Sequence, residues 1–563
     1  MIDSRSTAQR LLVLCALFVI KGVFYSLVLP MWEGYDEYAH LAFIQHIALH
    51  HTLTLPDTRV SQEIDQSLHL APVPWELVKL NPSYTSHDQY WRLPAQERER
   101  RQAQLRDLPI AYQYTTGEAF LYEGKQAPFY YLVTSPVYAL ARQTALPTRV
   151  LIFRFLNVLI GALILPITFA AGRKTFLNSE LAFVAPALIA SMPELYIDIA
   201  RVGNESMAIV FYSTFTLLLL CAVERGSKYL ALSGISLGLL LVSKAYGLAA
   251  IPALVFVILC SALISSRRWR VIISGALAIT LAALISFWWY LRNVRLVGSV
   301  MWTDGAPDRT ITPLEIIRSI SRVDWWTAVK SLASSHIWFG DWSFLSVRTW
   351  MYQVLEAFAL ISAIGLIVLA LRAYKQQKGI SRLSVHVMVY SSFVASIAYH
   401  VLMNFLNYGV GASPGWYLYA VIVPEMILLI AGLFAFQAGR RLSIALIVSF
   451  FLLELYTVHW VLIPYYTGII AHAADGGLRA FHISQLRAIG IGELLARLQI
   501  NRPSFITAGA LITSWLCFLT ASVAVVIVGL QSLRRIPESG AMTLSLRYPH
   551  DRIEAPAEAR SRR

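Results

Sequence analysis

The sequence predicts an all-α polytopic membrane protein with about 12, or at most 13, transmembrane helices. Apolar residues make up 57% of the 563 residues, charged residues only 14%, and the mean hydropathy is +0.57. The chain also contains repeated apolar runs close to twenty residues long, which is the length that a helix needs to cross a bilayer. The net charge of +14 comes from short Lys and Arg clusters between these runs, so we set nucleic acid aside as a partner.

The basic clusters also predict the threading, because Lys and Arg favour the cytoplasmic side of a membrane. Arg5 and Arg10 precede the first apolar run, which has no small-residue cleavage site after it and is expected to be a retained signal-anchor. With the N-terminus in the cytoplasm, every basic cluster falls on the cytoplasmic side. The spans are expected at 11–31, 154–172, 181–197, 205–223, 229–247, 249–266, 271–291, 350–371, 384–403, 416–436, 442–463 and 506–530.

One further apolar segment, 128–146, is long enough to span but contains Pro136 and Arg142. A crossing there would move every later basic cluster to the other side. We therefore expect an interfacial or re-entrant helix, with a thirteenth crossing as the alternative.

This threading divides the chain into a membrane domain, 1–533, and a basic tail, 534–563, that is expected to be disordered and cytoplasmic. Three long loops fall outside the cytoplasm, at 32–127, 292–349 and 464–503. The first is the largest, is expected to contain interfacial helices, and carries 13 acidic against 8 basic residues between positions 33 and 125. It therefore differs in charge from the rest of this basic chain.

An acidic stretch, Glu33-Gly34-Tyr35-Asp36-Glu37-Tyr38-Ala39-His40, follows the first span directly. From Tyr35 onward, apolar residues fall on one side and polar residues on the other, which suggests an amphipathic helix lying on the membrane surface, with Asp36 and His40 one turn apart. The acids can simply complement the positive end of that helix. Alternatively, two carboxylates and an imidazole at a membrane boundary form a candidate catalytic group.

Candidate cation sites occur later in the chain. Arg201, in a segment with Asp198, Asn204 and Glu205, can pair with Asp198 or hold a phosphate through its planar fork of donors. Lys244 and Arg292, each near the outer end of an apolar run, can extend to the interface or bind a phosphate.

A metal site is chemically plausible as well. Oxygen ligands of the kind offered by Asp36, Glu37 and Asp341, with His40, suit a divalent cation such as Mg²⁺, Mn²⁺ or Ca²⁺. The spacing of these residues does not show whether they meet, so the metal remains open.

Five stretches, in this order, resemble the GT-C superfamily of membrane glycosyltransferases, in particular the branch of protein mannosyltransferases and aminoarabinose transferases. They are Tyr35-Asp36-Glu37-Tyr38-Ala39-His40, Gln126-Ala127-Pro128-Phe129-Tyr130-Tyr131-Leu132, Arg154-Phe155-Leu156-Asn157 on a helix ending Arg173-Lys174, Ala200-Arg201 with Asn204-Glu205, and Ser243-Lys244. The sequence departs from the family pattern at Gln126-Ala127, where His-Pro is common, at Glu205, where Asp is frequent, and at Trp416, where an Arg is usual.

The resemblance implies transfer of a sugar from a polyprenyl-phosphate donor to an extracytoplasmic glycan, lipid or protein, in the plasma (inner) membrane of a bacterium. It implies Asp36 as the general base, Glu37 as the group that orients the acceptor or a metal, and His40 as the support of Asp36. The implied donor-phosphate ligands are Arg201, Lys244 and Arg292, and the supporting residues are Asp198, Asn204, Glu205, Tyr131 and Asp341.

Two other classes remain open on the sequence. A flippase or transporter of a lipid-linked sugar also needs many spans and a cationic phosphate site, but the acidic first loop and the lack of a visible internal repeat disfavour it. A polysaccharide polymerase or ligase is expected to carry its large outer loop late in the chain, whereas here it comes first.

Overall fold

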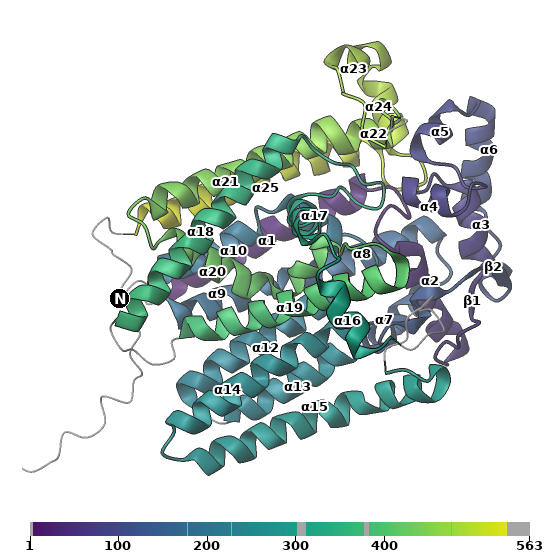
Figure 1. The fold of residues 1–563 in the computed structure, drawn as a ribbon. Helices are drawn as coiled ribbons and strands as arrows, with labels where there is room; N and C mark the ends of the chain where they lie inside the picture. Colours follow the sequence, from purple (N-terminus) through teal and green to yellow (C-terminus); the bar gives the residue numbers. More distant parts are fainter. Residues whose placement is uncertain are drawn as a thin grey trace, which may run out of the picture.

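The computed structural model describes residues 4–176, 178–226, 228–300, 311–375, 382–473 and 476–536, and the chain is predominantly helical. Long apolar helices lie side by side in a bundle, while the helices and strands of the first loop gather at one end of it (Figure 1). The N-terminus lies at the opposite end (Figure 1).

Ten helical segments in the described part of the chain are long and apolar enough to cross a membrane. They are α1 (Ser4–Val28), α8 (Leu146–Ala162) continued by α9 (Ile164–Thr175), α12 (Glu205–Arg225), η3 (Ala245–Ala250) with α14 (Ile251–Ile264), α15 (Arg268–Val297), α18 (Thr349–Lys375), α19 (Arg382–Tyr408), η4 (Gly415–Val421) with α20 (Ile422–Leu433), α21 (Gly439–Tyr456) with η5 (Thr457–Leu462) and α22 (Ile463–Tyr466), and α25 (Ala508–Arg534). The prediction of a polytopic helical membrane protein is confirmed at this level.

Two of the twelve predicted spans have a different form. The segment 181–197 is a pair, α10 (Ser179–Ile189) and α11 (Pro193–Ile199), bent by 63° at the intervening turn, and counting it as one span gives eleven. The segment 229–247 contains the 14-residue helix α13 (Lys228–Leu241), which packs between α12 and α15, and the start of η3. Helix α13 is shorter than a bilayer requires, so the predicted number of spans is not reached by length alone.

The segment 128–146, for which we expected an interfacial or re-entrant helix, forms α7 (Phe129–Ala141) and the start of α8. Helix α7 has only 13 residues, contains Pro136, and is not among the candidate spans of the described chain. It packs against α2 (Glu37–His50). Because α7 and the rest of the first loop cover α2, nearly all of α2 is buried, so the expected amphipathic helix, with one polar and one apolar side, is not formed.

The rest of the first loop forms a small layered unit beyond α2. Its strands, β1 (Arg59–Ser61) and β2 (Thr116–Phe120), pair antiparallel, a feature that the all-α prediction omitted. Its helices are α3 (Gln62–Leu70), α4 (Trp75–Leu80), α5 (His87–Arg92), α6 (Ala95–Arg106), η1 (Ile110–Gln113) and η2 (Tyr122–Lys125). The later loops add α16 (Pro313–Ile320), α17 (Trp325–Ile337), α23 (Ile483–Ile489) and α24 (Ile491–Leu498).

Basic residues from distant parts of the chain meet at the N-terminal end of the bundle. Arg10 pairs with Glu180 at 2.8 Å, Arg382 donates a 2.7 Å hydrogen bond to the carbonyl of Lys174, and Arg535 lies 3.7 Å from Glu180. These four basic residues, which the threading assigns to one side of the membrane, therefore lie near two acidic residues, Glu180 and Glu224, at the same end of the helices. Most of the tail, from 537 onward, lies outside the described residues.

Candidate active site

The acidic stretch after α1 turns sharply into α2, and Asp36 occupies the first position of that turn. Asp36 has left-handed backbone angles, φ 57° and ψ 16°, which Asp tolerates better than most residues. Its side chain is half-buried and accepts a hydrogen bond from the hydroxyl of Tyr122 in η2. The backbone and Tyr122 together fix a carboxylate that keeps partial access to its surroundings.

His40, one turn further along α2, is buried beside Tyr131 and Glu123. Its Nδ1 lies 2.7 Å from the hydroxyl of Tyr131 and 3.7 Å from Oε2 of Glu123. Burial, together with Arg201 and Lys244, holds the pKa of His40 well below its usual range, so the imidazole is neutral at pH 7.

Glu123 responds to the same surroundings in the opposite direction. Burial and the nearby Asp36 carboxylate raise the pKa of Glu123 to about 7. The ordinary value is 4.5. Around Asp36 the structure thus gathers a neutral histidine and a carboxyl group that titrates near neutral pH, an arrangement suited to proton transfer.

Arg201 joins this group directly. Its Nη1 donates a 2.6 Å hydrogen bond to the carbonyl of Tyr35, and its Nη2 donates one of 2.8 Å to Asp198. A Cβ added to Gly34 would lie 2.5 Å from Cβ of Arg201, so the acidic stretch can approach this arginine only with a glycine at that position. The sequence left open whether Arg201 pairs with Asp198 or holds a phosphate, and in the structure it pairs with Asp198.

Lys244 reaches the same place from the turn after α13. Its Nζ forms an ion pair with Oε1 of Glu205, and that oxygen is 3.9 Å from Nη2 of Arg201. The other oxygen of Glu205 accepts a 2.9 Å hydrogen bond from the hydroxyl of Tyr246. Glu205 therefore brings the two cations together beside the acidic stretch.

Glu37 has a different environment from Asp36. It is fully buried and forms a bidentate pair with Arg154 of α8, at 2.7 and 2.6 Å. The backbone N–H groups of Trp32 and Val202 each donate a 3.0 Å hydrogen bond to it. Each carboxylate oxygen thus already has two donors, which ties the start of α2 to α8.

The remaining predicted residues lie around this centre. Asn204 donates a 2.9 Å hydrogen bond to the carbonyl of Ser243, next to Lys244. Arg292 donates to the carbonyl of Thr54 and packs over the ring of Trp289. Asp341 is buried with a left-handed backbone, and burial and Glu33 raise its pKa well above its usual range. One of its oxygens has no hydrogen-bond partner within the described residues.

The proposed metal ligands do not meet. In the described part of the chain, no three His, Cys, Asp or Glu side chains are arranged so that they could hold a metal ion. Glu37 is saturated by Arg154 and backbone groups, and the nearest polar partners of His40 are Tyr131 and Glu123. A site built from Asp36, Glu37, His40 and Asp341 is therefore not formed.

Sequence reasoning missed several residues of this centre. Tyr122 and Glu123 stand shortly before the Gln126-Ala127-Pro128 segment, which was the nearest available signal. Tyr246 follows Lys244 by two positions. Arg154 belongs to one of the stretches that carry the resemblance, but its pairing with Glu37 has no local signature.

Comparison with known proteins gives structural likenesses only. No protein-family model matches the chain, and no curated protein matches it. Among solved structures it resembles ArnT from Cupriavidus metallidurans bound to undecaprenyl phosphate, with 13% identity and a TM-score of 0.45 over 92% of this chain and 76% of that chain. It also resembles AglB, the oligosaccharyltransferase of Archaeoglobus fulgidus, in complex with an inhibitory peptide and a dolichol-phosphate. That match has 13% identity and a TM-score of 0.42 over 92% of this chain and 56% of that chain.

The chain thus spans about three quarters of ArnT and little more than half of AglB. At 13% identity these likenesses concern the fold and assign no activity to this chain. Both proteins are GT-C membrane glycosyltransferases, the superfamily that the sequence resembles.

Proposed function

We propose that this chain is an integral membrane glycosyltransferase that moves a sugar from a polyprenyl-phosphate donor to an acceptor outside the cytoplasm. The observation that carries the proposal is the meeting of the half-buried Asp36 with Arg201, which binds the adjacent carbonyl of Tyr35, and with Lys244 through Glu205. A base and a cationic phosphate site side by side are what a sugar transfer from a lipid phosphate requires.

In the proposed reaction, Asp36 accepts the proton of an acceptor hydroxyl or amine while the acceptor oxygen or nitrogen attacks the anomeric carbon. The bond from that carbon to the phosphate oxygen breaks, and polyprenyl phosphate leaves with the electron pair. Arg201 and Lys244 stabilise its negative charge. Attack from the face opposite the leaving group inverts the anomeric centre.

The other residues act through these three. We assign Glu37 a positioning role, because its four hydrogen bonds hold the start of α2 and leave no free oxygen for an acceptor. His40, which is hydrogen-bonded to Tyr131, is assigned to support Asp36 from one turn further along α2. Asp198, Asn204 and Glu205 are assigned to orient Arg201 and Lys244. These roles need no metal ion, so no step of the proposal passes through one.

Arg292 and Asp341 belong to the outer part of the proposed site. The carbonyl that Arg292 binds belongs to Thr54, whose hydroxyl donates a hydrogen bond to the carbonyl of Gly124, next to Glu123. Arg292 is therefore proposed as a cation at the rim. Asp341, in the loop after α17, is proposed as a support for the acceptor.

We further propose that both termini are cytoplasmic in a bacterial plasma membrane and that the first loop faces outward. The gathering of Arg10, Lys174, Arg382 and Arg535 at one end of the bundle supports this orientation. In this arrangement, the bent pair α10–α11 and the short helix α13 complete twelve membrane segments.

The test uses the full chain in vesicles, a polyprenyl phosphate carrying a radiolabelled sugar, and envelope glycans, lipids and proteins as acceptors. Asp36→Asn should lower transfer by about 10²-fold or more, since general base catalysis typically contributes that much. Asp57→Asn, which changes an exposed carboxylate of the same loop, should not. Wild-type transfer by Asp36→Asn would exclude Asp36 as the base. Movement of the labelled donor between leaflets without any product would favour the flippase class instead.

A further inference from the structure

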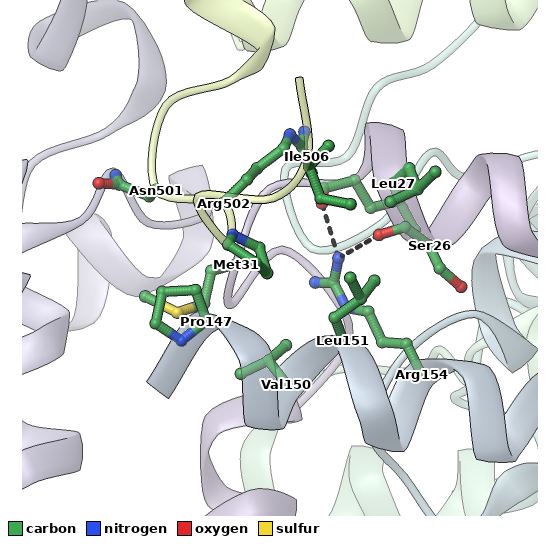
Figure 2. Close-up of a pocket in the computed structure, with 12 residues that line it drawn as sticks. Ser26, Leu27, Met31, Pro147, Val150, Leu151, Arg154, Asn501, Arg502 and Ile506 are labelled. Carbon is green, nitrogen blue, oxygen red and sulfur yellow. Dashed lines mark hydrogen bonds between the residues drawn. The ribbon is translucent and has the colours of Figure 1, made fainter. Parts of the chain in front are cut away.

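A separate pocket lies between the outer ends of α1 and α8 and the turn before α25 (Figure 2). Leu27, Met31, Val150, Leu151 and Ile506 supply apolar walls. Two guanidinium groups, those of Arg154 and Arg502, also line it, and both donate to the carbonyl of Leu29. The pocket therefore combines apolar walls with two positive charges.

Arg154 is already satisfied. Its Nε and Nη2 bind Glu37, its Nη1 donates to the carbonyls of Ser26 and Leu29, and its Nη2 also donates to the carbonyl of Pro30. These contacts use all five N–H groups of the guanidinium, and the carboxylate neutralises its charge. Arg154 is thus part of the wall of the pocket and has no free donor for a ligand.

Arg502 differs from Arg154 both in its free N–H groups and in its lack of a carboxylate partner among the described residues. It donates to three carbonyls, those of Leu498, Leu29 at 3.2 Å and Val28 at 2.8 Å, which leaves two of its five N–H groups without a partner in the described part of the chain. None of its described neighbours is a carboxylate within 4.0 Å. Burial and the nearby Arg154 lower the pKa of Arg502 to about 9, as expected for a cation without a counter-ion.

The surroundings of Arg502 indicate what kind of anion would fit beside it. The carbonyls of Val28 and Leu29 mark the end of the first candidate span, Thr7–Val28, which is the depth at which lipid phosphates lie. Below them, Val23, Phe155 and Ile506 are partly buried against an apolar cluster of Leu27, Leu151, Leu498 and Leu511, and they offer apolar contact to a lipid chain. Phe505, 61% exposed, adds an apolar side chain at the entrance.

We propose that this pocket binds the phosphate of an anionic membrane lipid, with Arg502 as its charged ligand and the lipid chain lying against Leu27, Leu151 and Ile506. One free N–H group remains on each terminal nitrogen, so two phosphate oxygens can each accept one hydrogen bond. The site is distinct from the Asp36 centre and does not depend on the proposed function.

The pocket is nonetheless joined to that centre through one residue. Arg154 lines the pocket and also holds Glu37, the residue after Asp36. A lipid bound at Arg502 would pack next to Arg154, which is itself buried with Glu37. Because such a lipid binds only the folded chain, its binding is expected to raise the thermal stability.

The experiment measures binding to the purified full chain in detergent by native mass spectrometry and thermal shift. The probes are phosphatidylglycerol, diacylglycerol as the uncharged lipid, and inorganic phosphate as the free anion. Arg502→Gln should weaken phosphatidylglycerol binding about tenfold or more, because hydrogen bonds to a charged group are lost. Arg487→Gln removes an exposed arginine of the neighbouring helix α23 and should leave binding unchanged.

If Arg502→Gln fails to fold, Ile506→Phe provides a second route, because it fills the pocket and keeps the arginine. It should abolish the stabilisation by phosphatidylglycerol. Equal binding by wild type and Arg502→Gln would overturn the proposal. Diacylglycerol binding as tightly as phosphatidylglycerol would remove the role of the phosphate, and inorganic phosphate binding as tightly would remove the role of the lipid.

Discussion

The pair between Glu37 and Arg154 allows a sharp test of how the acidic stretch is held. Glu37 is fully buried and receives two hydrogen bonds from Arg154 and two from backbone N–H groups. In Glu37→Gln, an amide NH₂ group would replace one carboxylate oxygen. This NH₂ group would face N–H donors of Arg154 and the backbone, to which it cannot hydrogen-bond as an acceptor. Arg154 would also become a buried cation without a carboxylate in the described part of the chain.

The expected cost follows from that geometry. Removing one partner of a buried ion pair typically costs about 3–5 kcal/mol of unfolding free energy, mainly because the other charge is left uncompensated. Glu37→Gln should show a loss in this range. The double variant Glu37→Met/Arg154→Met should lose less than the sum of the two single variants, because no buried charge remains.

The assay is equilibrium unfolding of the full chain in mixed micelles, followed by tryptophan fluorescence. Glu97→Gln is the matched control, since Glu97 also pairs with two arginines but on the exposed face of α6, where such pairs contribute little. A loss in Glu37→Gln no larger than in Glu97→Gln, or strictly additive losses in the double variant, would refute the reasoning.

Three further predictions concern other buried groups. Burial and Asp36 raise the pKa of Glu123 to about 7, so the folded protein keeps a proton that the unfolded chain loses near pH 4.5. The contribution of Glu123 to the free energy of unfolding should therefore decline as the pH rises from 4.5 to 7. Unfolding at several pH values should show this decline in the wild type and not in Glu123→Gln. Lys21→Met should cost about 3–5 kcal/mol in the same unfolding assay, since it leaves Glu454, its buried partner at 3.0 Å, unpaired. Gly34→Ala should lower the free energy of unfolding by about 1–3 kcal/mol, because the added methyl group would overpack against Arg201, and it should reduce sugar transfer.

Each of these has a clear contrary outcome. The first fails if wild type and Glu123→Gln have parallel stability profiles between pH 5 and 8. For the second, a Lys21→Met/Glu454→Gln double variant no more stable than the sum of its parts would show that the two charges are not coupled. For the third, Gly492→Ala is the comparison, because nothing lies within 4 Å of a Cβ added there, and equal effects of the two substitutions would remove the steric explanation.

The positions of the membrane helices could be predicted from the sequence because apolar length is a local property. All twelve expected segments contain helix, and four of the basic residues used for the threading, Arg10, Lys174, Arg382 and Arg535, form ion pairs or hydrogen bonds between distant segments. The failures are equally physical. Helix α13 has only 14 residues and lies between two long neighbours, α12 and α15, where Gly234 and Gly238 allow a close approach to α15.

The candidate site was only partly predictable. Arg201 and Lys244 could be found because a charge within an apolar stretch is costly unless it has a role. The pairing of Glu37 with Arg154 and the approach of Glu123 to His40 bring together residues far apart in the chain. Spacing along the sequence does not reveal such contacts. Tyr122 and Glu123 approach Asp36 only because the first loop folds over α2.

The cations of this protein fall into two electrostatic classes, and the difference bears on what each can bind. Arg201 and Lys244 are already compensated by Asp198 and Glu205, so an incoming phosphate must share them with carboxylates. Such sharing limits affinity and favours release, which suits a leaving group that has to depart in every cycle. Arg502 has no described carboxylate partner and keeps two N–H groups free, so an anion there gains the full interaction. The first environment therefore suits a transient ligand and the second a resident one.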